Sequence, residues 1–175
     1  AFAIKIPQEY GGLGLSQTNY NRAIHLVASF CGSTAVLLSA HQSIGVPQPL
    51  KLFGTKEQKK KYFPKFAAGM ISAFALTEES AGSDPRQMTT TAVPIEDGKY
   101  FLINGEKLWC TNGPIAGVII VMVVTPSKMK DGKERKQFTA FIVDTDTPGF
   151  EIVHRCHFMG LHGIQNGLIR FKNVR

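Results

Sequence analysis

Residues 75–84 read Ala-Leu-Thr-Glu-Glu-Ser-Ala-Gly-Ser-Asp, and residues 109–113 read Trp-Cys-Thr-Asn-Gly. The first stretch begins soon after Gly69, where the spacing of apolar residues changes from helical to strand-like. Hydroxyl groups and backbone N–H groups in a turn can hydrogen-bond to negative charge on a bound group. The two stretches therefore indicate a binding turn, supplied in part by Thr77, where a helical segment meets a β segment.

The segment before Gly69 is expected to be helical. Four residues recur at helical spacing behind Ser16, a predicted N-cap: Tyr20, Ile24, Val27 and Cys31. Residues 34–41 are apolar on almost every side, which predicts a helix buried among others. Thr55 and Gln58 form the pattern of a capping box that opens a third helix. Pro64 is expected to break or kink that helix, because its ring clashes with the preceding turn.

After Gly69, several segments have the alternating or continuous β-branched character of strands. They are residues 71–77, 88–93, 100–103, 106–111, 118–125, 138–143 and 168–171. Asn104-Gly105 predicts a two-residue hairpin, because both positions tolerate positive φ. Residues 128–136 are charged and contain Gly132, so we expect an exposed loop there. The predicted fold class is α+β, with a helical bundle followed by an antiparallel β-barrel or sandwich.

The composition is that of a folded globular chain. A hydrophobic share of 43% and a charged share of 19% argue against a disordered or coiled-coil protein. The formal charge of +7 comes in large part from a lysine-rich run at 56–65. We favour a solvated helix face there over a phosphate-binding patch, and expect no nucleic-acid partner. Cys31, Cys110 and Cys156 lie far apart, which favours neither a zinc site nor a disulfide framework and fits a reducing compartment.

Other patterns are better explained without a function. Residues 117–124 form an apolar run that is too short to span a bilayer, and no basic leader is seen, so no integral membrane segment is expected. Residues 11–14 are glycine-rich but lack the G-x-G-x-x-G spacing, so a structural turn is favoured over a dinucleotide site. His154 and His157 lie between predicted strands, and no metal site is expected. His41 is interpreted as a hydrogen-bonded core or pocket residue. No hydrolase or kinase motif is found.

Helices followed by a β domain, with T-E-x-x-x-G-S-D at the junction and W-x-T-N-G after it, resemble the N-terminal and middle domains of the acyl-CoA dehydrogenase family. Residues 6–15 match the family's first turn, and residues 40–45 with 52–55 are most similar to its very-long-chain branch. The resemblance implies a partial N-terminal helical domain over 1–70 and a middle β domain over 71–175. It also implies that the family's C-terminal helical domain is absent from these residues.

The resemblance implies FAD as the cofactor. The residues that match the family's flavin-binding motifs are Phe74, Ala75, Leu76, Thr77, Glu78, Gly82, Ser83, Trp109, Cys110 and Thr111. By this similarity, Leu76 and Thr77 would bond the pyrimidine edge of the flavin, Trp109 would pack against its ring, and Thr111 would place a hydroxyl near N5. Ser83 would also contact the acyl-CoA substrate.

The implied activity is the FAD-dependent α,β-dehydrogenation of long-chain fatty acyl-CoA to trans-2-enoyl-CoA in β-oxidation. No glutamate here matches the family's general base, so no catalytic residue is expected in these residues, and the fragment is expected to be inactive alone. The resemblance further implies electron-transfer flavoprotein as the electron acceptor and a homodimer or homotetramer. The compartment would be the cytoplasm in a bacterium and the mitochondrial matrix side in a eukaryote.

Two alternatives remain open at this stage. The chain could belong to an acyl-CoA dehydrogenase-like assembly or binding protein that has lost catalysis. It could also belong to an oxygen-using flavin oxidase or monooxygenase of the same fold. A carboxylate base elsewhere in the protein would favour the dehydrogenase, and fast reoxidation of reduced flavin by air would favour the oxygen-using enzyme.

Overall fold

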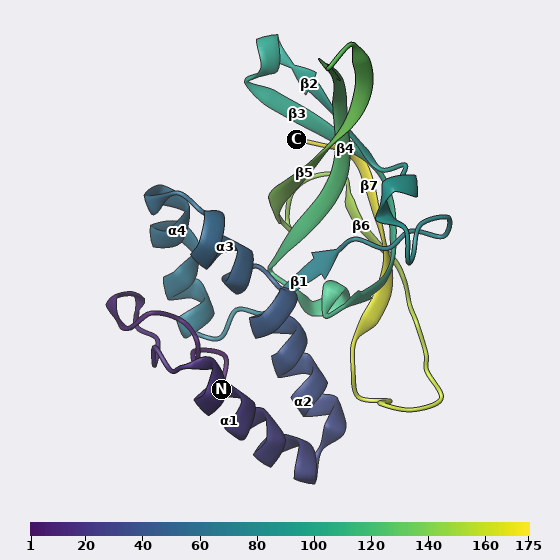
Figure 1. The fold of residues 1–175 in the computed structure, drawn as a ribbon. Coiled ribbons are helices and arrows are strands. Elements are labelled where there is room, and N and C mark those ends of the chain that lie inside the picture. The colour runs from purple at the N-terminus through teal and green to yellow at the C-terminus, as the bar shows by residue number, and fades with distance from the viewer.

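The computed structural model describes residues 1–175, with every side chain except that of Lys130. Figure 1 shows helices gathered on one side of the molecule and a curled sheet on the other. The helices are α1 (Gln17–Phe30), α2 (Gly32–Ser39), α3 (Pro47–Phe53) and α4 (Lys56–Ala67), and a π-helical turn, Ala40–Ile44, follows α2. The strands are β1 (Ser72–Ala75), β2 (Thr91–Ile95), β3 (Tyr100–Thr111), β4 (Val118–Lys130), β5 (Lys133–Asp144), β6 (Phe150–Arg155) and β7 (Asn166–Val174). The predicted α+β class is confirmed.

Local capping chemistry sets the helix starts. The Ser16 hydroxyl accepts the N–H of Asn19, and Thr55 forms a reciprocal capping box with Gln58, so both predicted caps are confirmed. Helix α4 is not broken at Pro64 and continues to Ala67. Pro64 is exposed, whereas Phe63 on the same helix is fully buried. The buried face of α4 therefore holds the last turn in place despite the missing proline N–H.

The sheet is mixed, which corrects the prediction of a purely antiparallel domain. The strand order is β1-β4-β2-β3-β7-β6, with β5 paired to β4. Strands β1 and β2 each pair with β4 in parallel, whereas the other pairings are antiparallel. The pairing of β1 brings the segment before residue 76 against the middle of the domain, beside β3. Strand β6 was not predicted, because Ile152 and Val153 are both exposed and give no alternating pattern.

The predicted hairpin at Asn104-Gly105 is wrong, because β3 continues through both residues. Gly105 has a φ of +143° and lies at an irregularity in the pairing with β7. A Cβ atom at this position would lie 2.6 Å from the Thr90 hydroxyl oxygen. The glycine is therefore needed for a β-bulge and a close approach to Thr90, and not for a chain reversal.

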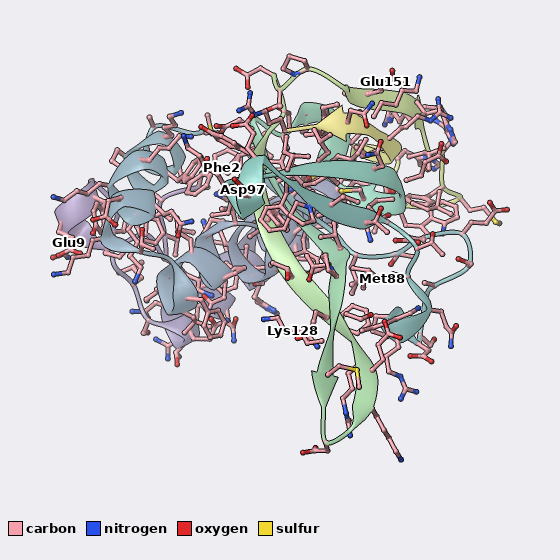
Figure 2. The ribbon with its side chains drawn as sticks, turned by 90° about the horizontal axis from the view of Figure 1, so that it is seen from above. Phe2, Glu9, Met88, Asp97, Lys128 and Glu151 are labelled. Carbon is pink, nitrogen blue, oxygen red and sulfur yellow. The ribbon has the colours of Figure 1, made fainter. Side chains whose placement is uncertain are left out.

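The predicted loop at 128–136 is also wrong over most of its length. Strands β4 and β5 extend through it and are joined only by Asp131 and Gly132, which both have positive φ. Figure 2 shows this hairpin, with Lys128 on it, projecting from the body of the molecule. Both faces of its outer part meet solvent, so its sequence is mostly polar and lacks the alternation that identifies a half-buried strand.

Two apolar clusters hold the fold together, one on each side of β4. Val118 and Ile120 pack with Phe63 and Phe66 between the sheet and the helices. The alternate residues of β4 face the inside of the curled sheet, in a cluster that includes Ile169. The helices are thereby fixed against one face of the sheet, with β1 at the junction. No helix of the described chain is long and apolar enough to cross a membrane.

Candidate functional site

A groove of about 480 Å³ lies between the helices and strands β1 and β3, within the range of small-molecule sites. Its helical wall consists of Ser43, Ile44, Gln48, Pro49, Leu52 and Phe53. Its sheet wall consists of Phe74, Leu76, Thr77, Leu108, Trp109 and Thr111. The groove is thus mostly apolar, with Ser43 and Gln48 as polar side chains on the helical wall and two threonines on the sheet wall, and its described lining contains no carboxylate.

The groove brings together half of the residues that sequence comparison suggested for the flavin. Phe74, Leu76, Thr77, Trp109 and Thr111 all line it, although the two segments are more than thirty residues apart in sequence. The other five do not line it: Ala75, Glu78, Gly82, Ser83 and Cys110. Their roles remain predictions.

Strand geometry explains much of this division. Successive side chains of a strand point to opposite faces, so Ala75 and Cys110 face the core when their neighbours face the groove. The Cys110 thiol contacts the Phe74 carbonyl oxygen at 3.5 Å, and burial raises its pKa to about 12. It is therefore an inert core thiol at neutral pH. Gly82 and Ser83 lie exposed on the turn after β1.

The backbone at Leu76 and Thr77 offers hydrogen-bond donors. Within the described chain, neither N–H group has a protein acceptor, and the Thr77 hydroxyl has no partner either. The Thr77 carbonyl oxygen accepts the N–H of Leu108 at 2.8 Å, which ties this segment to β3. Two adjacent amide donors at the wall of an apolar groove are suited to an electron-rich, planar ligand edge.

Lys107 fixes the direction of one of these donors. Its ammonium group is fully buried and donates to the Leu76 carbonyl oxygen at 3.0 Å. Every described peptide bond is trans, so the Leu76 carbonyl and the Thr77 N–H, which share one peptide unit, point in opposite directions. The Thr77 N–H therefore points away from the buried ammonium group. Sequence reasoning missed Lys107, because a lysine in a strand normally faces solvent.

Glu78 is the counter-ion of Lys107. Its carboxylate lies 2.7 Å from the lysine Nζ and also accepts the N–H and hydroxyl of Thr89 and the N–H of Thr90. Burial alone would raise the pKa of Glu78, but the bonds from Lys107, Thr90 and Thr89 outweigh it and lower the pKa to about 2. Burial lowers the pKa of Lys107, and the attraction of Glu78 opposes that shift. Glu78 thus holds the turn from beneath, outside the groove.

Trp109 is held in an unusual backbone conformation. Its φ is +56°, within a bulge of β3 opposite β7, and the residue is 52% exposed. The indole ring contacts Phe158 at a centroid distance of 5.6 Å. Positive φ in a bulky residue is costly and is found where the surroundings enforce it, often at functional sites. Half-exposure leaves one part of the ring accessible to a ligand in the groove.

Two buried asparagines, neither assigned a role from the sequence, anchor this bulge. Asn112 has a φ of +66° and donates its amide to the Leu37 carbonyl of α2 at 3.0 Å. Asn166, at the start of β7, donates to the Trp109 carbonyl at 3.2 Å and to the Thr111 hydroxyl at 2.9 Å. The only sequence signal at position 166 is the dipeptide Asn-Gly, which suggests a turn and not a contact with β3.

His41 joins the helices to β1. It is a hydrogen-bonded core residue, as the sequence predicted. Its Nδ1 accepts the Ser72 N–H at 3.0 Å, so the neutral ring carries its proton on Nε2. The ring is fully buried between Phe2 and Phe66. Burial penalises the charged form and lowers the pKa of His41 to about 4.

The protein is expected to lose stability as the pH falls from about 6.5 to 4. His41 has a lower pKa in the fold than the ordinary value of 6.5, so its contribution is complete above pH 6.5 and is lost as protons bind the unfolded state. The difference between these two pKa values corresponds to a loss of roughly 3 kcal/mol in the free energy of unfolding. Glu78 adds a second loss between pH 4.5 and about 2. Denaturant unfolding across this range should show the first decline, and His41→Gln should remove it. If the free energy of unfolding of His41→Gln fell with pH between about 6.5 and 4 as steeply as that of the unmodified protein, His41 would not be the cause of the decline.

Family comparisons identify the class of protein. A model described as acyl-CoA dehydrogenase, N-terminal domain, matches residues 1–70, and one described as acyl-CoA dehydrogenase, middle domain, matches residues 73–174. The chain therefore belongs to the acyl-CoA dehydrogenase family.

Among the described residues, no group of three histidine, cysteine or acidic side chains could hold a metal ion.

Individual relatives agree with this assignment. The chain is 51% identical to the probable acyl-CoA dehydrogenase FadE10 of Mycobacterium tuberculosis, over 99% of this chain and 26% of that protein. It is 40% identical to the human mitochondrial very long-chain specific acyl-CoA dehydrogenase, over 100% of this chain and 27% of that protein. A crystal structure of acyl-CoA dehydrogenase complexed with FAD from Bacillus anthracis superposes with a TM-score of 0.86 at 34% identity, covering 97% of this chain and 28% of that one. The chain thus spans about a quarter of the length of the curated relatives it matches.

Proposed function

We propose that this chain forms the flavin-facing part of a longer FAD-dependent enzyme that removes hydrogens from the α and β carbons of fatty acyl-CoA thioesters. The observation that carries the proposal is the groove between helices and sheet. The unpaired N–H groups of Leu76 and Thr77 lie on the same wall as Trp109 and Thr111. Family membership supports the same cofactor and the same class of reaction.

The groove suits a flavin in shape and in chemistry. The amides of Leu76 and Thr77 would hold the electron-rich edge of the ring, and the half-exposed indole of Trp109 would pack on its face. When bound, FAD supplies the acceptor of the hydride that leaves the β carbon. Thr111 would present its hydroxyl to the redox-active part of the ring. Because these groups are fixed by the fold, they need little rearrangement when charge develops.

The helical wall suits an acyl chain. Ile44, Leu52 and Phe53 line it with apolar surface and are exposed, so they can cover an aliphatic ligand and exclude water. We propose a long-chain substrate, because the chain is 40% identical to a very long-chain specific enzyme. We keep Ser83 as a proposed thioester contact, although it lies on an exposed turn and not in the groove.

The α-proton must be removed by a base that the described groove does not supply. No aspartate or glutamate is among its described lining residues, and Glu78 is buried in its pair with Lys107. We therefore propose that another part of the longer protein provides the carboxylate. We also propose an electron-transfer flavoprotein as the acceptor and a homo-oligomeric assembly.

The test uses the full-length protein loaded with FAD. Anaerobic mixing with palmitoyl-CoA should bleach the flavin absorbance, and the spectrum should recover when an electron-transferring partner is added. Retained flavin that is bleached by none of a series of acyl-CoA chain lengths would contradict the dehydrogenase and support an assembly role. Rapid recovery in air alone would support an oxygen-using enzyme instead.

A further inference from the structure

Asn166 lies behind the sheet wall of the groove and contacts two of the residues that we place against the flavin, Trp109 and Thr111. Its side-chain nitrogen is 3.2 Å from the Trp109 carbonyl oxygen and 2.9 Å from the Thr111 hydroxyl oxygen. Asn166 itself is 3% exposed and does not line the groove. We propose that Asn166 is a positioning residue that directs the Thr111 hydroxyl proton into the groove, an inference that rests on the proposed function.

The Trp109 carbonyl determines which way the Asn166 amide points. A carbonyl oxygen can only accept a hydrogen bond, so the amide atom beside it must be the NH₂ group. The reversed amide would place two carbonyl oxygens against each other. The same NH₂ group then donates to Thr111, whose oxygen must act as the acceptor in that contact.

This assignment leaves the Thr111 hydroxyl proton free. The proton cannot point at Asn166, and no acceptor for it is found among the described residues. Thr111 lines the groove, so the free proton can reach a ligand there. The Asn166 Oδ1 atom is buried without a described partner. An unpaired buried oxygen is unfavourable for folding. The Asn166 side chain therefore makes its two NH₂ hydrogen bonds while its Oδ1 atom stays unpaired.

The backbone around Asn166 holds the amide in place. The carbonyl oxygen of Asn166 accepts the N–H of Cys156 at 2.7 Å, and the preceding carbonyl, of Gln165, accepts the N–H of Asn112 at 2.6 Å. Asn166 is also directly paired with Thr111 in the register of β7 and β3. The residue is therefore fixed from both sides, and its side chain can hold Trp109 in its strained conformation and orient Thr111 at once.

A purely structural role makes a different prediction. If Asn166 only satisfied the Trp109 carbonyl, its removal would lower stability without changing the properties of bound flavin. We therefore measure the midpoint reduction potential of bound FAD, as well as its rate of reduction by palmitoyl-CoA, in the full-length protein. The variants are Asn166→Leu, which removes both donors at similar volume, Thr111→Val, and the two combined. Thermal unfolding identifies the variants that fold.

Asn166→Leu should slow flavin reduction about 10- to 100-fold, a loss of the same order as that caused by removing residues that orient metal-binding side chains. It should shift the midpoint potential in the same direction as Thr111→Val. The double variant should slow reduction by less than the product of the two single effects, because both residues act on the Thr111 hydroxyl. Asn104→Leu is the matched control: Asn104 also bonds across β3 and β7, to Asn173, but neither residue lines the groove, and the variant should change neither quantity.

A folded Asn166→Leu protein with unchanged potential and rate would overturn the inference while leaving the proposed function intact. Additive effects in the double variant would overturn it as well. Failure of the unmodified protein to bind FAD would instead overturn the proposed function. If Asn166→Leu does not fold, a crystal structure of the unmodified, FAD-loaded protein decides. Asn166 should remain bonded to Trp109 and Thr111 with the hydroxyl facing the flavin, and a hydroxyl turned elsewhere would reject the inference.

Discussion

Lys107→Met is expected to lower the free energy of unfolding by about 3–5 kcal/mol, the usual cost of removing one partner of a buried ion pair. Lys107 is fully buried, and its Nζ lies 2.7 Å from the Glu78 carboxylate. Without the ammonium group, that carboxylate stays buried with only neutral donors from Thr89 and Thr90. The Leu76 carbonyl loses its donor as well. Denaturant unfolding of the protein measures the change directly.

Two further variants separate charge from packing. The double variant Lys107→Met with Glu78→Gln should recover more than half of the lost stability, because it removes the unpaired charge and keeps an acceptor for Thr89 and Thr90. Arg86→Met breaks an exposed pair with Asp84 and should change stability little. Equal losses in Lys107→Met and Arg86→Met would contradict the importance of the buried pair.

Thr111→Val is expected to slow flavin reduction by acyl-CoA by about 10²–10³-fold, the typical cost of losing one preorganised donor at a reacting group. Valine has nearly the shape of threonine but cannot donate a hydrogen bond. Thr111 is half-buried at the end of β3, where a β-branched residue suits the strand, so the fold should persist. Rapid mixing of the FAD-loaded, full-length protein with palmitoyl-CoA gives the rate.

Thr111→Ser is the matched control for this prediction. Serine keeps the hydroxyl and its contact with Asn166, so its rate should stay close to that of the unmodified protein. Thermal unfolding should show that both variants are folded. A Thr111→Val protein that reduces its flavin at the unmodified rate would remove Thr111 from the proposed site.

The sequence predicted those features that local chemistry determines. The Ser16 cap and the Thr55–Gln58 capping box form as expected, because side chains within three residues make them. The change from helix to strand near Gly69 is likewise a matter of local periodicity. The hairpin predicted at Asn104-Gly105 failed because its signal is also local. The pairing of β3 with β7 and the contact with Thr90 override that signal.

The candidate site was predicted less completely. The groove residues within 74–77 and 109–111 belong to two contiguous sequence motifs, so the motifs were enough to identify them. Lys107 and Asn166 support the site from behind, and their partners lie 29 to 57 residues away in sequence. Such contacts depend on strand register and on a bulge, which periodicity does not specify.

Titration of FAD into the flavin-free, full-length protein tests the central claim most directly, which is that β1 and β3 together form a flavin site. Flavin fluorescence should change saturably to one FAD per chain, and Trp109→Ala should weaken the affinity because the ring loses its aromatic contact. A folded protein that leaves added FAD free in solution would contradict the account.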